Sequence, residues 1–163
     1  MHYRSTKTGF DILLNDILLI AHSNDEPAFF VGTGEPESNP HRGNFKVLDR
    51  KISRFPLHVA GVATDDAVTR VSLKRASSAS PEVVLEFGVK GENIGVRLLD
   101  RSLNRFWMRL QNEVGEHVWG GGEQFSHFNL AGRRFPMWTQ VPGVGRDLTT
   151  RMALIAENDA KAG

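Results

Sequence analysis

The chain contains no cysteine among its 163 residues. This absence excludes disulfide bonds, a cysteine nucleophile and cysteine-ligated metal, and it suits a reducing compartment. The chain also lacks an excess of charge of one sign, since 20 Lys and Arg face 19 Asp and Glu, for a formal net charge of +1. A balanced charge creates no global field that attracts nucleic acid or an anionic membrane, so we expect neither as a partner.

Long apolar runs are missing as well. The longest run near the start covers residues 17–21 and is preceded by Asn15 and Asp16. It is too short for the core of a signal peptide and far too short for a membrane-spanning helix. We therefore expect a cytoplasmic protein.

Motifs for metals and cofactors are absent too. None of the histidines has the His-x-x-x-His or glutamate-flanked spacing of a metal site: His2, His22, His41, His58, His117 and His127. The glycine run at residues 120–122 lacks the spacing of a dinucleotide fingerprint and the Lys and Ser or Thr of a P-loop. We expect no cofactor and no metal.

The apolar residues that are present recur mostly at period two, in short runs bounded by Gly, Pro, Asn and Asp. This pattern indicates β-strands. The runs at residues 10–14 and 17–21 are separated only by Asn15 and Asp16, which tolerate the positive φ of a tight hairpin. Further strands are predicted at 69–74, 83–89, 93–98 and 105–111.

In the last of these predicted strands, side chains should alternate between two faces. Phe106, Met108 and Leu110 are expected on one face, and Trp107, Arg109 and Gln111 on the other.

Helix should be scarce, because no window of helical length combines an N-cap, an apolar stripe and a C-terminal glycine. A short helical turn is predicted only at residues 53–62 or 97–105. The sequence thus predicts an all-β sandwich with little helix, as a single domain over residues 1–163.

Residues 115–147 differ from the rest of the chain. They are rich in glycine and contain two of the three tryptophans. Such a segment has too many special backbone positions for a plain strand pair, so we expect a long loop with a functional purpose.

Several sequence blocks carry a resemblance. They are Gly122-Glu123-Gln124-Phe125-Ser126; Gly132-Arg133 with Phe135-Pro136 and Trp138-Thr139; Gly143-Val144-Gly145-Arg146; Arg42-Gly43-Asn44-Phe45; and Ala21-His22-Ser23 with Asp25 and Pro27. Taken in order, they resemble the N-terminal domain of glycoside hydrolase family 31, in its sulfoquinovosidase branch. One departure is Trp119-Gly120-Gly121, where members of this branch tend to have Tyr-Gly and another small residue.

The resemblance implies a β-sandwich related to galactose mutarotase, followed in the chain by a catalytic (β/α)8 barrel. It also implies retaining hydrolysis of α-glycosides by two barrel carboxylates, which lie about 5–5.5 Å apart in retaining enzymes. A barrel needs roughly 200 residues or more, so we expect neither carboxylate in this chain. The chain alone should then be inactive, with residues 115–147 facing the missing barrel.

The resemblance also suggests which residues lie beside the sugar. We expect Trp138, Arg146 and Gln124 to be adjacent to substrate, because an aromatic face suits a pyranose ring and a guanidinium suits a sulfonate. A structural role is the competing interpretation. Trp138 and Phe135 would then be buried against the barrel with Phe125, and the arginines would form ion pairs there: Arg133, Arg134 and Arg146. Glu123 would accept hydrogen bonds from the glycine-rich turn.

Two other functions stay open. A free-standing carbohydrate-binding module would use Trp107, Trp119 or Trp138 as a sugar platform. An RNA-binding module would use the arginines and aromatics near residues 125–151, but only composition favours it.

Overall fold

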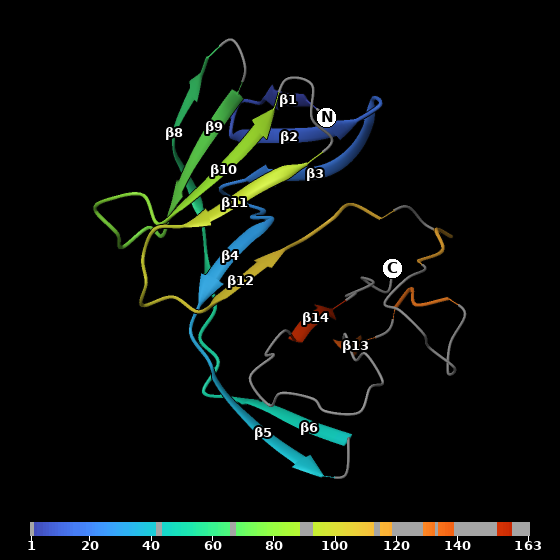
Figure 1. Ribbon diagram of the computed structural model, residues 1–163. Coiled ribbons are helices and arrows are strands. Elements are labelled where there is room, and N and C mark those ends of the chain that lie inside the picture. Colours follow the sequence, from blue (N-terminus) through green and yellow to red (C-terminus); the bar gives the residue numbers. More distant parts are fainter. Residues whose placement is uncertain are drawn as a thin grey trace. The chain divides into compact units, whose positions relative to one another are not determined.

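The computed structural model shows two compact units, Met1–Gln111 and Asn112–Gly163, each taken by itself below (Figure 1). It describes residues 2–41, 44–65, 68–88, 93–112, 115–118, 129–132, 134–138 and 153–157. Within these ranges the regular elements are all β-strands. The predicted all-β fold is confirmed.

The first sheet contains the predicted hairpin. β1 (His2–Ser5), β2 (Gly9–Leu14) and β3 (Ile17–Ser23) are antiparallel in the order β1-β2-β3. Asn15 and Asp16 form the turn with φ of 50° and 64°, as their side chains allow. At Gly9 a Cβ atom would lie 1.9 Å from the His22 carbonyl oxygen, so this strand contact requires glycine.

The second sheet has four antiparallel strands in the order β11-β10-β9-β8. They are β8 (His58–Thr64), β9 (Val68–Lys74), β10 (Val83–Gly88) and β11 (Ile94–Leu98). The last three confirm predicted strands. The helical turn predicted at 53–62 is wrong, because β7 (Phe55–Pro56) and the first part of β8 occupy it. A register shift between Val59 and Gly61 breaks the period-two pattern that would have revealed β8.

A third sheet places β4 (Phe29–Gly32) between β12 (Arg105–Met108) and β7. β12 confirms the strand predicted at 105–111, although it ends earlier. A two-stranded hairpin of β5 (Glu35–His41) and β6 (Asn44–Arg50) extends away from the other strands of this unit (Figure 1).

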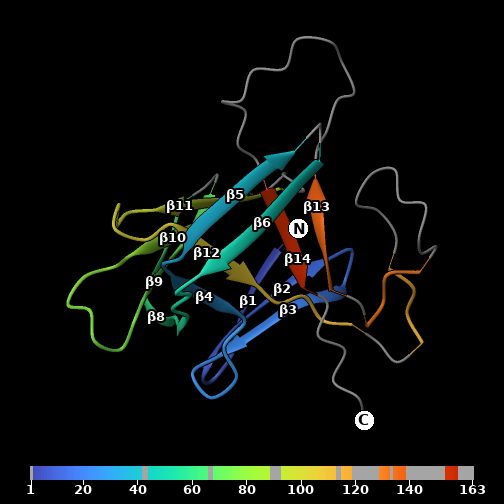
Figure 2. The same cartoon turned by 90° about the horizontal axis from the view of Figure 1, so that it is seen from below.

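The core of the first unit is formed by facing sides of the sheets, which gives the predicted sandwich (Figure 2). Phe29 is fully buried at its centre, with ring centroids 5.9 Å from Phe10 and 6.1 Å from Phe106. The remaining buried members come from β2, β3, β4, β9 and β10 and from neighbouring loops: Ile12, Ile20, Ala28, Val31, Leu57, Val71, Leu73, Val83, Leu85, Phe87 and Leu103.

Candidate functional site

Three of the predicted site residues lie in one short strand of the second unit. Arg134, Phe135 and Trp138 belong to β13 (Arg134–Trp138), which pairs antiparallel with β14 (Ala153–Glu157). In this register Trp138 is opposite Ala153. The other predicted site residues lie outside the described residues: Glu123, Gln124, Phe125, Arg133 and Arg146.

One asparagine ties together the two ends of the stretch from residue 118 to residue 129, which contains the glycine run at residues 120–122. The Asn129 Oδ1 atom accepts hydrogen bonds from the backbone N–H groups of Val118 at 3.1 Å and Ala131 at 3.0 Å. The neighbouring Leu130 N–H donates to the Val118 carbonyl at 2.8 Å, and Leu130 is buried. Residues 118 and 129–131 are therefore fixed to each other.

These hydrogen bonds hold residues 118 and 129, which flank the segment between them, close to each other. We call this pair of flanking positions the base of the segment. Glu123, Gln124 and Phe125 all belong to that segment. Sequence reasoning missed Asn129. Its signal was available, because an asparagine beside a glycine-rich stretch is a typical acceptor for nearby backbone N–H groups.

Gly132 then turns the chain from this base into β13. Its φ of 70° lies in the left-handed region, which a glycine adopts without steric cost. Gly132 is thus a special backbone position between the tie and the strand that holds Trp138.

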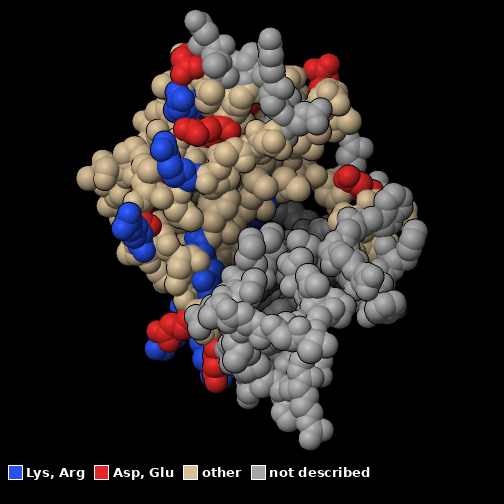
Figure 3. Space-filling view, in the orientation of Figure 1, with Lys and Arg blue, Asp and Glu red and all other residues tan. Residues whose placement is uncertain are grey.

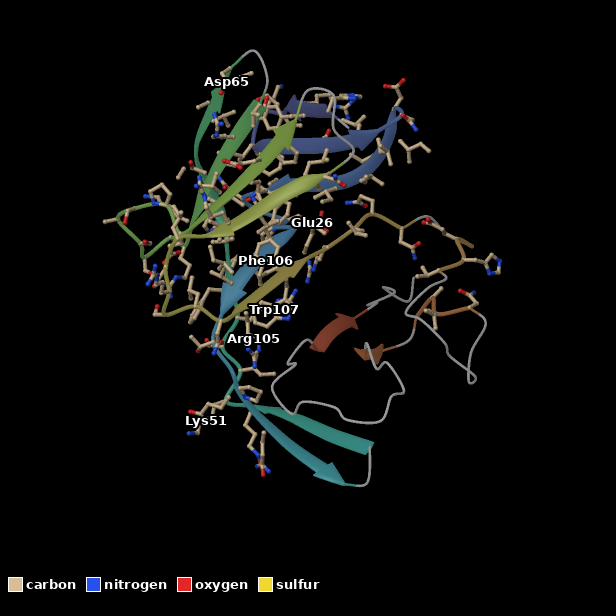
Figure 4. All side chains as sticks on the ribbon, in the orientation of Figure 1. Glu26, Lys51, Asp65, Arg105, Phe106 and Trp107 are labelled. Atoms are coloured by element: carbon tan, nitrogen blue, oxygen red, sulfur yellow. The ribbon has the colours of Figure 1, made fainter. Side chains whose placement is uncertain are left out.

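The outer face of β12 shows how the proposed sugar platform at Trp107 is built. Trp107 pairs with Phe30 of β4, while Phe106 packs against the core on the other face. The predicted alternation is confirmed for Phe106 and Trp107, which Figure 4 labels, whereas Leu110 and Gln111 lie beyond the end of β12. The Arg54 guanidinium carbon lies 4.1 Å from the Phe30 ring centroid and 5.4 Å from that of Trp107, and the Arg109 carbon lies 5.0 Å from Phe30.

These guanidinium groups cover the aromatic surface. Phe30 is only 9% exposed, although it is on the outer face of its sheet. Cation–π contacts of this type stabilise partly exposed aromatics by roughly 0.5–2 kcal/mol. The cluster of Phe30, Trp107, Arg54 and Arg109 is therefore a packed surface and presents less bare ring than an open sugar platform.

Comparison with known proteins identifies the family. No family model matches the chain. The chain is 44% identical over 163 residues to the sulfoquinovosidase of Agrobacterium fabrum (strain C58), covering 100% of this chain and 24% of that protein. It is 30% identical over 163 residues to the sulfoquinovosidase of Escherichia coli (strain K12), covering 99% of this chain and 24% of that protein.

A solved structure agrees with these relatives. It is a family 31 sulfoquinovosidase from E. rectale in complex with the aza-sugar inhibitor IFGSQ, with a TM-score of 0.72 and 34% identity over 92% of this chain and 22% of that chain. The chain belongs to glycoside hydrolase family 31. It spans about a quarter of the length of the curated relatives, at 24% of each, consistent with an N-terminal domain. The resemblance inferred from the sequence blocks is confirmed.

His22, from one of those blocks, has a structural role in this family 31 domain. Its ring is 2% exposed, packs against the rings of both Phe10 and Phe29, and accepts the Ala28 N–H at Nδ1 over 3.1 Å. Burial, and secondarily the charge of His58, lowers the pKa of His22 to about 4. The imidazole is therefore neutral at physiological pH and holds the turn that leads into β4.

Arg75 and Glu82 form an ion pair that closes the loop between β9 and β10. Glu82 is buried and accepts hydrogen bonds from the Arg75 backbone N–H at 2.9 Å and from Arg75 Nε at 2.8 Å. The hydrogen bond from the Arg75 side chain lowers the pKa of Glu82, although burial opposes the shift. The loop of residues 77–81 lies between the two partners in the chain.

Neither a metal site nor a membrane span occurs in the described ranges. No group of three or more His, Asp and Glu side chains in them is placed to hold a metal ion. No helix long and apolar enough to cross a membrane is found there either.

Proposed function

We propose that this chain is a non-catalytic β-sandwich domain of a retaining α-glycosidase that hydrolyses α-sulfoquinovosides or α-glucosides. The observation that carries the proposal is the match of the whole chain to 24% of each sulfoquinovosidase. The catalytic carboxylates then come from a barrel domain encoded in the remaining length. The sugar is a partner through that larger enzyme, which acts in the cytoplasm and needs neither a cofactor nor nucleic acid.

Within this role, the second unit helps to wall the sugar site. Asn129 ties the base of the segment that contains Gln124 through hydrogen bonds of 3.1 and 3.0 Å. Trp138 belongs to β13, shortly after that base. An amide, an indole and the Arg146 guanidinium supply a hydrogen-bonding group, a flat apolar face and a donor suited to sulfonate.

A chimera tests the proposal. This chain replaces the matching quarter of the Agrobacterium fabrum sulfoquinovosidase, and hydrolysis of a chromogenic α-sulfoquinovoside is compared with that of the matching α-glucoside. We expect activity on the sulfonated sugar, with none from the chain alone. An inactive chimera that is folded would contradict the proposal.

Single substitutions in the chimera then test the site. Trp138→Ala, Arg146→Ala and Gln124→Ala should each lower kcat/KM by about tenfold or more, the effect of losing one positioned group. Trp107→Ala and Arg101→Ala, the latter at an exposed turn before β12, are the matched controls and should change kcat/KM less than threefold, by about 0.6 kcal/mol. Equal effects of both sets would assign Trp138 and Arg146 to the domain interface.

A free-standing carbohydrate-binding module is the second candidate. The cluster of Phe30, Trp107, Arg54 and Arg109 is where such a module would bind, because aromatic rings and guanidiniums share one face, although the guanidiniums cover part of the ring surface. Titration calorimetry of the chain alone with methyl α-sulfoquinovoside decides between the two. Binding that Trp107→Ala removes would favour the module, and no heat up to millimolar sugar would rule it out.

A further inference from the structure

The edge strand β11 carries an apolar row on the core side of its sheet. Val96 pairs with Leu85, and Leu98 pairs with Val83. Paired residues of an antiparallel sheet project from the same face. Both partners in β10 are fully buried, at 0% exposed, yet Val96 is 42% and Leu98 39% exposed. The row faces the core layer and remains uncovered there.

The opposite face of β11 is polar. Arg97 lies between the two apolar residues and reaches Glu86 at 3.4 Å, and Glu86 also pairs with Arg70 at 3.2 Å. Arg70 also pairs with Asp65 at 2.7 Å, so these ion pairs form a ladder across the sheet from Arg97 to Asp65. Acidic and basic side chains alternate on this side in Figure 3. A strand that pairs with β11 would therefore meet an apolar row on one face and a basic residue on the other.

The two edges of this sheet differ in how open they are to pairing. β8 has a register shift between Val59 and Gly61, and such bulges protect sheet edges against further strands. β11 is regular over all five residues of its pairing with β10. Among the described residues its other side has no strand partner. A regular, uncovered apolar edge is suited to accept a strand.

We propose that a β-strand from the rest of the full-length enzyme adds to the free edge of β11. The added strand places apolar side chains beside Val96 and Leu98 on one face of the sheet and an acidic side chain beside Arg97 on the other. The inference rests on the proposed function, since the relatives, of which this chain spans 24%, supply the additional length. A similar exposed apolar side chain occurs on β12, where Met108 is 42% exposed although its partner Phe29 is fully buried.

Hydrogen exchange measures the added strand directly. The rates of the β11 amides that point away from β10 are compared in the isolated chain and in the Agrobacterium chimera. New cross-strand hydrogen bonds should slow their exchange in the chimera by about tenfold or more. Equal rates in the two proteins would overturn the added strand.

Matched lysine substitutions in the chimera test the apolar row. Val96→Lys should lower the thermal midpoint, whereas Val62→Lys should leave it unchanged. Val62 is an equivalent control on the bulged edge, because it is 45% exposed and pairs with the buried Val71. Val96→Thr, which keeps the side-chain shape, should give a smaller shift in the same direction. Equal midpoints for the Val96→Lys and Val62→Lys variants would contradict the proposal.

Activity separates this inference from the proposed function. An active chimera with unprotected β11 amides would overturn the added strand and leave the enzyme-domain role intact. A folded, inactive chimera with protected β11 amides would support the strand and overturn the role in catalysis. Should the Val96→Lys variant fail to fold, the exchange rates of the unsubstituted chimera decide.

Discussion

The two units of the chain are held by different interactions. In the described part of the first unit, stability comes from a continuous apolar core around Phe10 and Phe29. In the described part of the second unit, the chain is fixed by the hydrogen bonds of Asn129 and by the pairing of β13 with β14. Because of this difference, we expect that substitutions can change the stability of the sandwich and the function of the second unit separately. Substitutions in the core should unfold the sandwich, and substitutions at Asn129 should displace the segment assigned to the sugar site.

The sharpest test of the core is Phe29→Ala. Phe29 is fully buried against Phe10, His22 and Phe106, so truncation should cost about 3–5 kcal/mol of unfolding free energy. Urea unfolding of the isolated chain measures the loss. Leu110→Ala, at a position 61% exposed, should stay within about 0.5 kcal/mol of the parent chain. Similar losses for the two variants would remove the distinction between core and surface.

The pH dependence of the core depends on His22. Its pKa of about 4 in the folded state lies below the 6.5 of the unfolded state, so acid favours unfolding. Its contribution is fully present above pH 6.5 and declines as the pH falls, with about 3 kcal/mol lost by pH 4. His22→Gln should flatten this part of the stability curve, since an amide oxygen can still accept the Ala28 N–H. An unchanged slope between pH 6.5 and 4.5 would contradict the assignment.

A smaller effect is expected at the ion pair that closes the β9–β10 loop. Glu82→Gln leaves the Arg75 guanidinium without its buried carboxylate and should cost about 2 kcal/mol. Glu86→Gln removes a carboxylate from the exposed ladder and should cost less than about 1 kcal/mol. Because the pKa of Glu82 is lowered, its stabilisation is lost only in acid below the ordinary carboxyl range. Thermal unfolding at pH 7 gives both values, and a larger loss for Glu86→Gln would be unexpected.

The most local change in stability should come from Asn129→Ala. Two backbone N–H groups lose their acceptor, at about 1 kcal/mol each, within the second unit only. The unfolding midpoint of the first unit should not move. In the chimera, by contrast, kcat/KM for the α-sulfoquinovoside should fall several-fold, with Asn129→Asp retaining more activity because it keeps the acceptor oxygen. Full activity of Asn129→Ala would break the link between this tie and the sugar site.

Whether a strand could be predicted from the sequence depended on which of its faces are buried. The hairpin around Asn15 and Asp16 was predicted because one face of it is polar and the turn residues are distinctive. β4 was missed because Phe29, Phe30 and Val31 are all buried, which erases the period-two pattern. β5 was missed because Pro36 and Pro40 are residues that strands usually avoid.

The candidate site was predictable only by resemblance. The blocks around Gln124, Trp138 and Arg146 indicated the family, but spacing alone could not show that Asn129 ties the chain at their base. An asparagine beside a glycine run is a typical acceptor for nearby backbone N–H groups, but the bond from the Val118 N–H to the Asn129 side chain spans 11 residues, and no spacing rule identifies that donor. The covering of Phe30 by Arg54 and Arg109 likewise needed the register of β4 with β12.

The most direct test of the central claim is the activity of three proteins on a chromogenic α-sulfoquinovoside and its α-glucoside counterpart. They are the isolated chain, the Agrobacterium enzyme without its matching quarter, and the chimera that joins them. We predict hydrolysis of the sulfonated substrate by the chimera alone. Hydrolysis by the isolated chain would place catalytic groups within these 163 residues and contradict the account.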